Sequence, residues 1–332
     1  MKFLKYLLAF AILLLVLFVS GPRVTFDAPN LLDTDIDVAL STLDEFVASR
    51  EAEVRNIKLN NQARIVWAND SLKQQTEYAL VYLHGFSASQ EEGAPIHTTF
   101  ARRYGMNLYL SRLEDHGRSD STSFMNLTPE NYIQSAEDAI DIGKKLGKKV
   151  IVMSCSTGGT LSVLLAAAGE DIHSLIMYSP NIDIYDSKSD VIMYPWGKSI
   201  ARMIAKGDYN RIQYDSLAQL YWNPVYHING IFAVKSIIKS FMNKEVFGKI
   251  TMPVFMGYYY KDEEMQDKVV SVSRMQDFFD QISTPDSLKR KVAFPEAGNH
   301  VISSHVMSKD VKGVMIETFK WAEEVLNLQT VQ

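Results

Sequence analysis

Short, mostly apolar runs separated by longer mixed segments recur along much of the chain. They occupy residues 79–83, 107–110, 150–153, 175–178 and 254–258. Continuous apolar runs of this length are typical of strands that are covered on both faces. Between them, apolar residues recur at helical spacing, notably over 129–146 and 158–168. This alternation predicts a mostly parallel sheet with flanking helices.

Further elements extend the pattern at both ends of this region. Two β-like stretches, 57–59 and 63–67, precede the first run, so six strands are expected before residue 181. After the last run we expect a helix over 272–282, a strand over 290–294 and a final helix over 309–328.

Residues 181–250 interrupt the alternation. This segment is rich in tyrosine, tryptophan and phenylalanine, and its pattern predicts several helices and no strand. An insertion of this size between two core strands is usually a cap over the strand ends. The alternative is an ordinary run of core helices.

The first 22 residues carry a basic start followed by an apolar run. Lys2 and Lys5 precede residues 6–19, which is the form of a secretory signal. With Phe3 and Leu4 counted, the run barely reaches the ~17–25 residues that cross a bilayer. Pro22 makes a poor cleavage site after Gly21. We therefore expect a signal peptide or an uncleaved transmembrane anchor, and an exported body that is anchored to the membrane by this segment, periplasmic or secreted.

The remaining organisation follows from these segments. Apolar residues over 31–54 recur at roughly helical spacing, which predicts an amphipathic helix within an N-terminal segment, residues 23–55. The core is then expected to comprise 56–180 and 251–332, with the cap over 181–250 between them.

Composition excludes several classes of protein. The 332 residues are 47% hydrophobic, enough for a large core, and 34 basic against 39 acidic residues give a net charge of −5. That balance does not indicate a nucleic-acid surface. Cys155 is the single cysteine, so neither an internal disulfide nor a thiolate zinc site is available. We expect no metal and no cofactor, and the sequence does not give the oligomeric state.

The first candidate for chemistry is Ser156, which lies between an apolar strand and an apolar helix. A serine on a tight strand-to-helix turn is exposed in a strained conformation, and the residues two before and two after it must be small. Ser154 and Gly158 occupy these positions, although glycine is usual at both. The alternative is that Ser156 only caps the helix. Cys155 is expected to point into the fold.

Two other segments supply partners for this serine. His84-Gly85-Phe86 follows a predicted strand, where a loop can direct backbone N–H groups at a forming anion. We assign the expected oxyanion hole to the N–H groups of Phe86 and Thr157. His300 follows the last predicted strand in a Gly-Asn loop, where a general base can reach the serine.

These motifs resemble those of the α/β-hydrolase family, and within it the capped serine esterases and monoacylglycerol-lipase-like enzymes. The resemblance covers about residues 57–328 and rests on four segments: His84-Gly85-Phe86, Asp115-His116-Gly117, Ser154–Gly159 and Gly298-Asn299-His300. It implies a mostly parallel sheet flanked by helices, with a helical cap after the sixth strand, and the chain order serine, acid, histidine. In this family the turn at His116 is structural.

The resemblance places the acid after the strand that follows the cap. Asp262 stands at the commonest distance from such a strand, whereas Asp267 begins Asp267-Lys-Val-Val270, which looks like the family's Asp-x-Val-Val segment. We prefer Asp267 and keep Asp262 as the alternative. Glu263 and Glu264 are interpreted as solvated loop charges.

The resemblance implies hydrolysis of a small-molecule or lipid ester with an apolar acyl group through an acyl-enzyme on Ser156, His300 and Asp267, as in a carboxylesterase or monoacylglycerol lipase. Two alternatives stay open. One is a serine peptidase or thioesterase on the same fold, and the other is a non-catalytic, hydrolase-like binding protein at the membrane.

Overall fold

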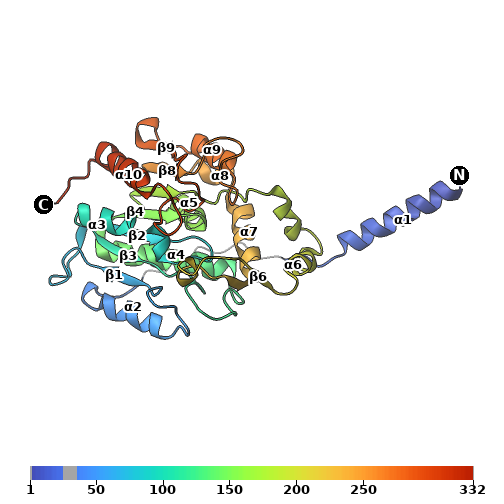
Figure 1. Cartoon of the computed structure of the whole chain (residues 1–332), viewed down its shortest axis with the longest axis horizontal. Helices are drawn as coiled ribbons and strands as arrows, with labels where there is room; N and C mark the ends of the chain where they lie inside the picture. Colours follow the sequence, from blue (N-terminus) through green and yellow to red (C-terminus); the bar gives the residue numbers. More distant parts are fainter. Residues whose placement is uncertain (1, 25–35, 332) are drawn as a thin grey trace.

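A seven-stranded sheet in the order β1-β3-β2-β4-β5-β8-β9 forms the centre of the computed structural model, which describes residues 2–24 and 36–331 (Figure 1). β1 runs antiparallel to β3, and every other neighbouring pair in this sheet is parallel. The predicted mostly parallel sheet is therefore confirmed. Its strands are β1 (Arg64–Val66), β2 (Thr76–Leu83), β3 (Asn107–Leu110), β4 (Gly147–Cys155), β5 (Ser174–Tyr178), β8 (Val254–Tyr258) and β9 (Lys289–Ala293).

Both faces of the sheet are buried, which explains the continuous apolar runs. Along β2, Ala79, Val81 and Leu83 belong to one apolar cluster, whereas Leu80 and Tyr82 belong to the other. This alternation is the period of two that a strand imposes on its side chains. Helices cover the two faces: α4 (Pro129–Leu146), α5 (Thr157–Ala168) and α9 (Val272–Gln281) on the first, α3 (Ile96–Arg103) and α10 (Val311–Val325) on the second.

Local capping explains why several helix boundaries match the prediction. At the start of α4, the Thr128 hydroxyl accepts from the Asn131 N–H, and the Asn131 side chain accepts in return from the Thr128 N–H. Pro129 follows at the first helical position, where it loses no hydrogen bond. The helix consequently spans the predicted residues 129–146.

The N-terminal part differs from the prediction. Residues 31–35 of the expected helix over 31–54 lie outside the described residues, and within the described part the helix is confined to a 3₁₀ turn, η1 (Leu40–Thr42), and α2 (Leu43–Ala52). The expected strand over 57–59 forms only one isolated bridge, between Ile57 and Arg118. The insertion consequently follows β5, the fifth strand along the described chain.

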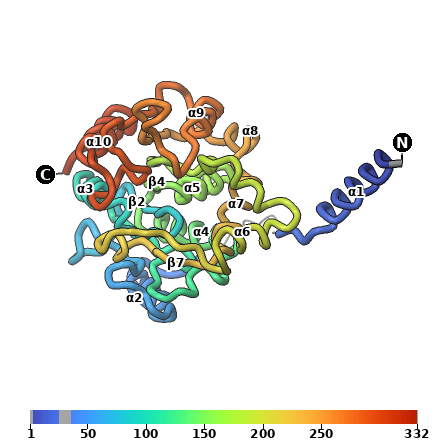
Figure 2. Tube along the Cα trace, turned by 45° about the vertical axis from the view of Figure 1, so that its right-hand side comes forward, coloured from blue at the N-terminus to red at the C-terminus, as the bar shows by residue number. Residues whose placement is uncertain are grey.

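The insertion is not purely helical, so the prediction of no strand is wrong. Two short strands pair antiparallel within it, and three-residue strands are too short to leave an alternating pattern. Figure 2 shows α6 and α7 grouped on the side of the body from which α1 departs. The elements are η3 (Ser187–Met193), α6 (Gly197–Ala205), β6 (Tyr209–Arg211), η4 (Ala218–Leu220), β7 (Val225–His227), α7 (Asn229–Phe241) and α8 (Lys244–Phe247).

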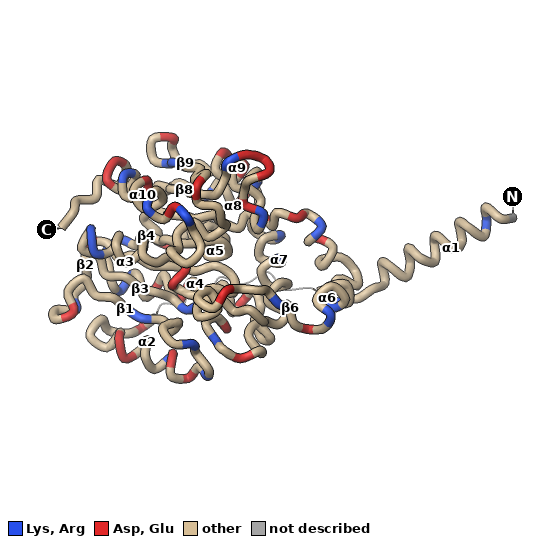
Figure 3. The backbone as a smooth tube through the Cα atoms, viewed as in Figure 1, with Lys and Arg blue, Asp and Glu red and all other residues tan. Residues whose placement is uncertain are grey.

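The helix α1 (Lys2–Val19) extends away from the body, and Figure 3 shows it uncharged over most of its length. It joins the insertion where the Trp196 indole N–H donates to the Leu17 carbonyl at 3.1 Å. No helix within the described residues is long and apolar enough to cross a membrane, so the predicted transmembrane helix is wrong.

Candidate active site

Ser156 lies at the junction of β4 and α5 in a strained backbone conformation. Its φ of 52° and ψ of −120° are unusual for a residue with a side chain. Backbone hydrogen bonds hold it there: its N–H donates to Tyr178 O at 3.0 Å, and its carbonyl accepts from Gly159 and Asn181 at 2.9 Å each. The neighbouring strand end and the first helical turn therefore fix the position of this serine.

Close packing explains the small neighbours of Ser156. A Cβ atom at Gly158 would stand 2.0 Å from the Leu83 carbonyl oxygen, so a larger residue would separate α5 from the end of β2. Ser154 is fully buried beneath the turn. The alternative role for Ser156 as a side-chain cap does not apply, because its hydroxyl makes no capping hydrogen bond.

His300 and Asp267 are brought together from two loops at the same edge of the sheet. The distance from His300 Nδ1 to Asp267 Oδ2 is 2.6 Å, and Asp267 is 1% exposed. The other carboxylate oxygen, Oδ1, accepts the N–H groups of Val269 at 2.8 Å and Val270 at 3.1 Å. Burial alone would lower the pKa of His300, but the charge and hydrogen bond of Asp267 outweigh it and raise that pKa.

Asp262, the alternative acid, lies exposed in the preceding loop. Its Oδ1 accepts the N–H groups of Glu264 at 2.9 Å and Met265 at 2.7 Å, which closes a local turn. Glu263 is also exposed, and it accepts a hydrogen bond from the Tyr260 hydroxyl at 3.0 Å. Of the two candidate acids, Asp267 is the one that the structure pairs with His300.

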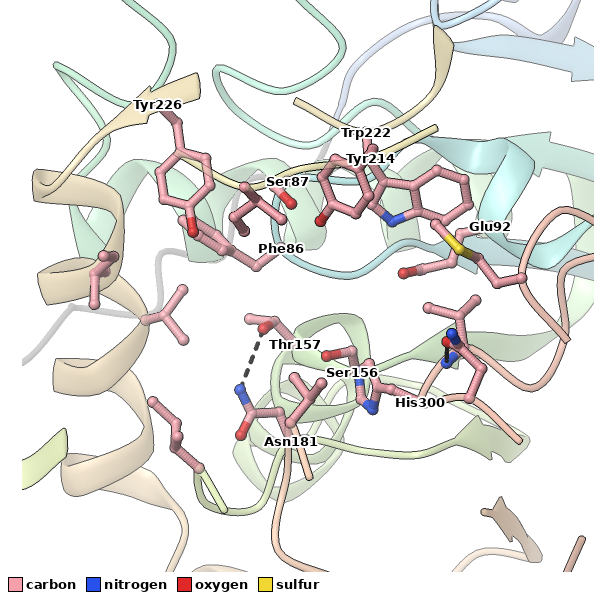
Figure 4. A pocket seen from close by; sticks show the side chains of 18 residues that line it. Phe86, Ser87, Glu92, Ser156, Thr157, Asn181, Tyr214, Trp222, Tyr226 and His300 are labelled. Carbon is pink, nitrogen blue, oxygen red and sulfur yellow. Dashed lines mark hydrogen bonds between the residues drawn. The ribbon is translucent and has the colours of Figure 1, made fainter. Parts of the chain in front are cut away.

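Ser156 and His300 line one cavity of about 460 Å³ (Figure 4). Figure 4 shows Ser156, Thr157 and His300 on one side of this space and Tyr214, Trp222 and Tyr226 across from them. The insertion thus contributes aromatic side chains to the wall opposite the serine, where Phe86 and Glu92 of the core also lie. Besides those aromatic residues, the residues within 181–250 that line the cavity are Asn181, Ile184, Ile212, Ile231 and Val234.

The loop after β2 passes directly over the serine. A Cβ atom at Gly85 would lie 2.9 Å from Ser156 Cβ and 2.8 Å from an oxygen of Glu92, so this approach requires glycine. Phe86 follows and borders the cavity, as does Thr157. The N–H of Thr157 belongs to the first helical turn, where backbone donors lack partners within the helix. Both residues expected to form the oxyanion hole therefore adjoin Ser156.

Two other histidines lie beneath this loop, away from the cavity lining. His84 accepts the Leu113 N–H at 3.1 Å, and burial lowers its pKa to about 4. His116 stacks on Tyr132 with ring centroids 5.2 Å apart. Both rings pack under the loop, which is a structural role.

Neither Cys155 nor a cluster of metal-binding side chains forms a second site in the described residues. The thiol of Cys155 is fully buried, and burial together with the charge of Glu92 raises its pKa well above the usual value. Among residues 2–24 and 36–331, no group of three or more His, Cys, Asp or Glu side chains is arranged to hold a metal ion.

Sequence reasoning missed two polar residues at the cavity. Glu92 is only 2% exposed on the 3₁₀ turn η2 (Gln90–Gly93), and Asn181 lies just after β5 with its amide 3.5 Å from the Thr157 hydroxyl. A glutamate in a loop segment is usually solvated, so no pattern indicated that Glu92 is buried.

The sequence matches no family model and no curated protein, but solved structures resemble the fold. A structure described with the metagenome-derived lipolytic enzymes LipS and LipT superposes with a TM-score of 0.64 at 13% identity, covering 80% of this chain and 98% of that one. A soluble variant of monoglyceride lipase from Saccharomyces cerevisiae gives 0.59 at 14%, covering 82% and 92%. Est1E from Butyrivibrio proteoclasticus gives 0.55 at 17%, covering 80% and 95%. This chain therefore has the α/β-hydrolase fold, with an insertion between β5 and β8.

Proposed function

We propose that this protein is a serine hydrolase that cleaves carboxylic esters with apolar acyl groups. The observation that carries the proposal is the hydrogen bond of 2.6 Å between His300 and Asp267 at the cavity that Ser156 also lines. A nucleophile, a base and an orienting acid that meet at the carboxyl ends of parallel strands are the requirements of acyl transfer.

In the proposed cycle, His300 accepts the proton of the Ser156 hydroxyl as its oxygen attacks the ester carbonyl. The N–H groups of Phe86 and Thr157 stabilise the resulting oxyanion. His300 then donates the proton to the departing alcohol, which leaves an acyl group on Ser156. Water releases the acid in a second round, with His300 again as base. Asp267 keeps the proton on Nδ1 and stabilises the imidazolium.

The cavity supports an apolar substrate. Its volume of about 460 Å³ suits a small molecule or a single acyl chain, and aliphatic and aromatic side chains of the insertion form much of its wall. The similar solved structures include lipolytic enzymes and a monoglyceride lipase, which supports an ester or monoglyceride as substrate. Export of the protein stays a prediction from the sequence.

The test is hydrolysis of p-nitrophenyl esters from acetate to dodecanoate by the full chain, with Ser156→Ala as the matched variant. We expect turnover by the wild type and a loss of at least about 10⁴-fold in kcat in the variant. Equal and negligible turnover by both proteins would contradict the proposal and favour a non-catalytic binding protein.

A further inference from the structure

Glu92 is a buried carboxyl group that the proposed acyl transfer does not use. It lies on η2, and Figure 4 shows its side chain directed toward the cavity, across from Ser156 and His300. A glutamate that is 2% exposed loses most of its hydration, so it needs compensating partners. Those partners connect it to both loops of the site.

The first connection is to the loop that passes over Ser156. The Gly85 N–H donates to Glu92 Oε2 at 2.6 Å, and the Tyr82 hydroxyl donates to the same oxygen at 3.4 Å. The short first bond fixes Gly85 immediately before Phe86, which is expected to supply an oxyanion donor. Displacing this loop would therefore displace the donor.

The second connection is to the segment that follows His300. The Ser303 hydroxyl donates to the backbone carbonyl of Glu92 at 2.9 Å, and the Ser304 hydroxyl to that of Glu91 at 3.3 Å. The loop after β2 that carries Gly85 and Phe86 is called the oxyanion loop below, and the segment 300–304 is called the histidine loop. The turn η2 thus contacts the oxyanion loop through the Glu92 side chain and the histidine loop through its backbone.

The two ionisable groups also interact through their charges. Burial raises the pKa of Glu92 to about 7, against the opposing effects of the Gly85 hydrogen bond and of charged His300. In turn, the charge of Glu92 adds to that of Asp267 in raising the pKa of His300. The other titratable groups with an interaction with Glu92 are Tyr82 on β2, Cys155 on β4, Tyr132 on α4 and Tyr214 in the insertion, none of which can carry a positive charge.

Resting on the function proposed above, we propose that Glu92 is a positioning residue with two roles: it holds the oxyanion loop at Gly85, and its charge sets the pH range in which His300 can accept a proton. An ionised Glu92 favours the imidazolium form of His300. The same negative charge disfavours an oxyanion beside Ser156. The two effects oppose each other in the transition state, so we expect loss of the charge to change kcat little.

Two conservative variants separate these roles. Glu92→Gln keeps an acceptor for Gly85 but removes the charge, so the acid limb of kcat/KM should move to lower pH by about half a unit to one unit. Its plateau kcat should stay within about threefold of wild type. Glu92→Asp keeps the charge but shortens the side chain, so kcat should fall about tenfold or more while the acid limb stays in place. Glu91→Gln, on the same turn, is the control and should change neither quantity.

A measurement that needs no turnover distinguishes failure of this proposal from failure of the proposed function. The titration of the His300 ring, followed by NMR through its Cε1–H signal, should have a lower midpoint in Glu92→Gln than in wild type and an unchanged midpoint in Glu91→Gln.

Absence of Ser156-dependent turnover would overturn only the proposed function. The charge role would be overturned if the midpoint of the His300 titration in Glu92→Gln equals that of wild type. It would also be overturned if both Glu92 variants lose kcat equally and the acid limb of kcat/KM does not shift. An undiminished kcat in Glu92→Asp would overturn the positioning role. If Glu92→Gln does not fold, the midpoint in Glu92→Asp still decides, since a value well below that of wild type would contradict the charge role.

Discussion

The two walls of the cavity are built in different ways. The core wall presents Ser156 and Thr157 where β4 ends and α5 begins, with Ser156 fixed by backbone hydrogen bonds, and His300 from the loop after β9, where it is hydrogen-bonded to Asp267. The wall from the insertion presents Ile212, Trp222 and other side chains from short turns and loops and from one helix. The difference indicates a division of labour in which the core performs the proposed chemistry and the insertion determines which substrates fit.

A buried ion cluster holds parts of the insertion together. Lys235 on α7 is fully buried, and its ammonium group lies 2.8 Å from Asp183, just after β5, and 2.7 Å from Asp190 on η3. Both carboxylates are partly exposed. A buried cation with two acidic partners requires all three groups to stay together, so this cluster joins α7 to the start of the insertion.

The largest expected effect lies in the core wall. Asp267→Asn leaves the shape but no longer holds the His300 tautomer, and we expect kcat to fall about 10⁴-fold for short and long esters alike. Asp262→Asn is the matched control and should retain wild-type kcat, which steady-state kinetics on two chain lengths will measure. A loss confined to Asp262→Asn would show that the other carboxylate is the acid.

The buried cluster within the insertion predicts the next largest effect. Lys235→Met removes the buried cation of Asp183 and leaves Asp190 with Lys239 alone, so the free energy of unfolding should drop by about 3 kcal/mol. Lys239→Met removes a half-exposed partner of the same Asp190 and should cost less than about 1 kcal/mol. Urea unfolding of both variants makes the comparison, and equal losses would mean that the buried cluster has no special role.

A substitution in the insertion wall should change selectivity without changing chemistry. Ile231→Trp adds a ring to the cavity, so kcat/KM for dodecanoate should fall about tenfold relative to acetate. Ser240→Trp adds the same ring at an exposed position of the same helix and should leave that ratio unchanged. A uniform loss for all chain lengths would contradict the division of labour.

The smallest expected effect is a pH dependence of kcat/KM that is determined by groups of the core. His300 must be neutral to accept a proton, and Asp267 raises its pKa above the ordinary 6.5, so kcat/KM should decline on acidification with a midpoint above 6.5. Initial rates across pH should give the same midpoint for short and long esters. A midpoint that depends on chain length would mean that the insertion takes part in the proton transfer.

The contrast between the core and the insertion also explains how much of the structure could be predicted from the sequence. Buried strands leave continuous apolar runs, and Thr128 and Pro129 mark the start of α4, so the predicted core elements, except the strand over 57–59, agree with the structure within a few residues. Ser156 and His300 stand beside such strands, and motif resemblance then favoured Asp267 over Asp262. Distance along the chain alone favours Asp262. The local turn that Asp262 closes after β8 leaves no periodic signal in the sequence, so the distance did not reveal that this turn separates Asp262 from His300.

The remaining features depend on contacts that no local pattern records. The strands β6 and β7 are three residues each and are defined by their pairing with each other. Glu92 is buried because Gly85 and the segment after His300 lie against it, and the contact with Ser303 in that segment joins residues far apart in sequence. The apolar start suggested a membrane span by composition, but no helix within the described residues is long and apolar enough to cross a membrane.

The most direct test of the central claim is covalent labelling of the nucleophile. The full chain is treated with diethyl p-nitrophenyl phosphate, and the modified peptide is identified by mass spectrometry, with Asp267→Asn and Asp262→Asn in parallel. We expect one label per chain, on Ser156, formed at the wild-type rate in Asp262→Asn and far more slowly in Asp267→Asn. Labelling at another residue, or at equal rates in both variants, would contradict it.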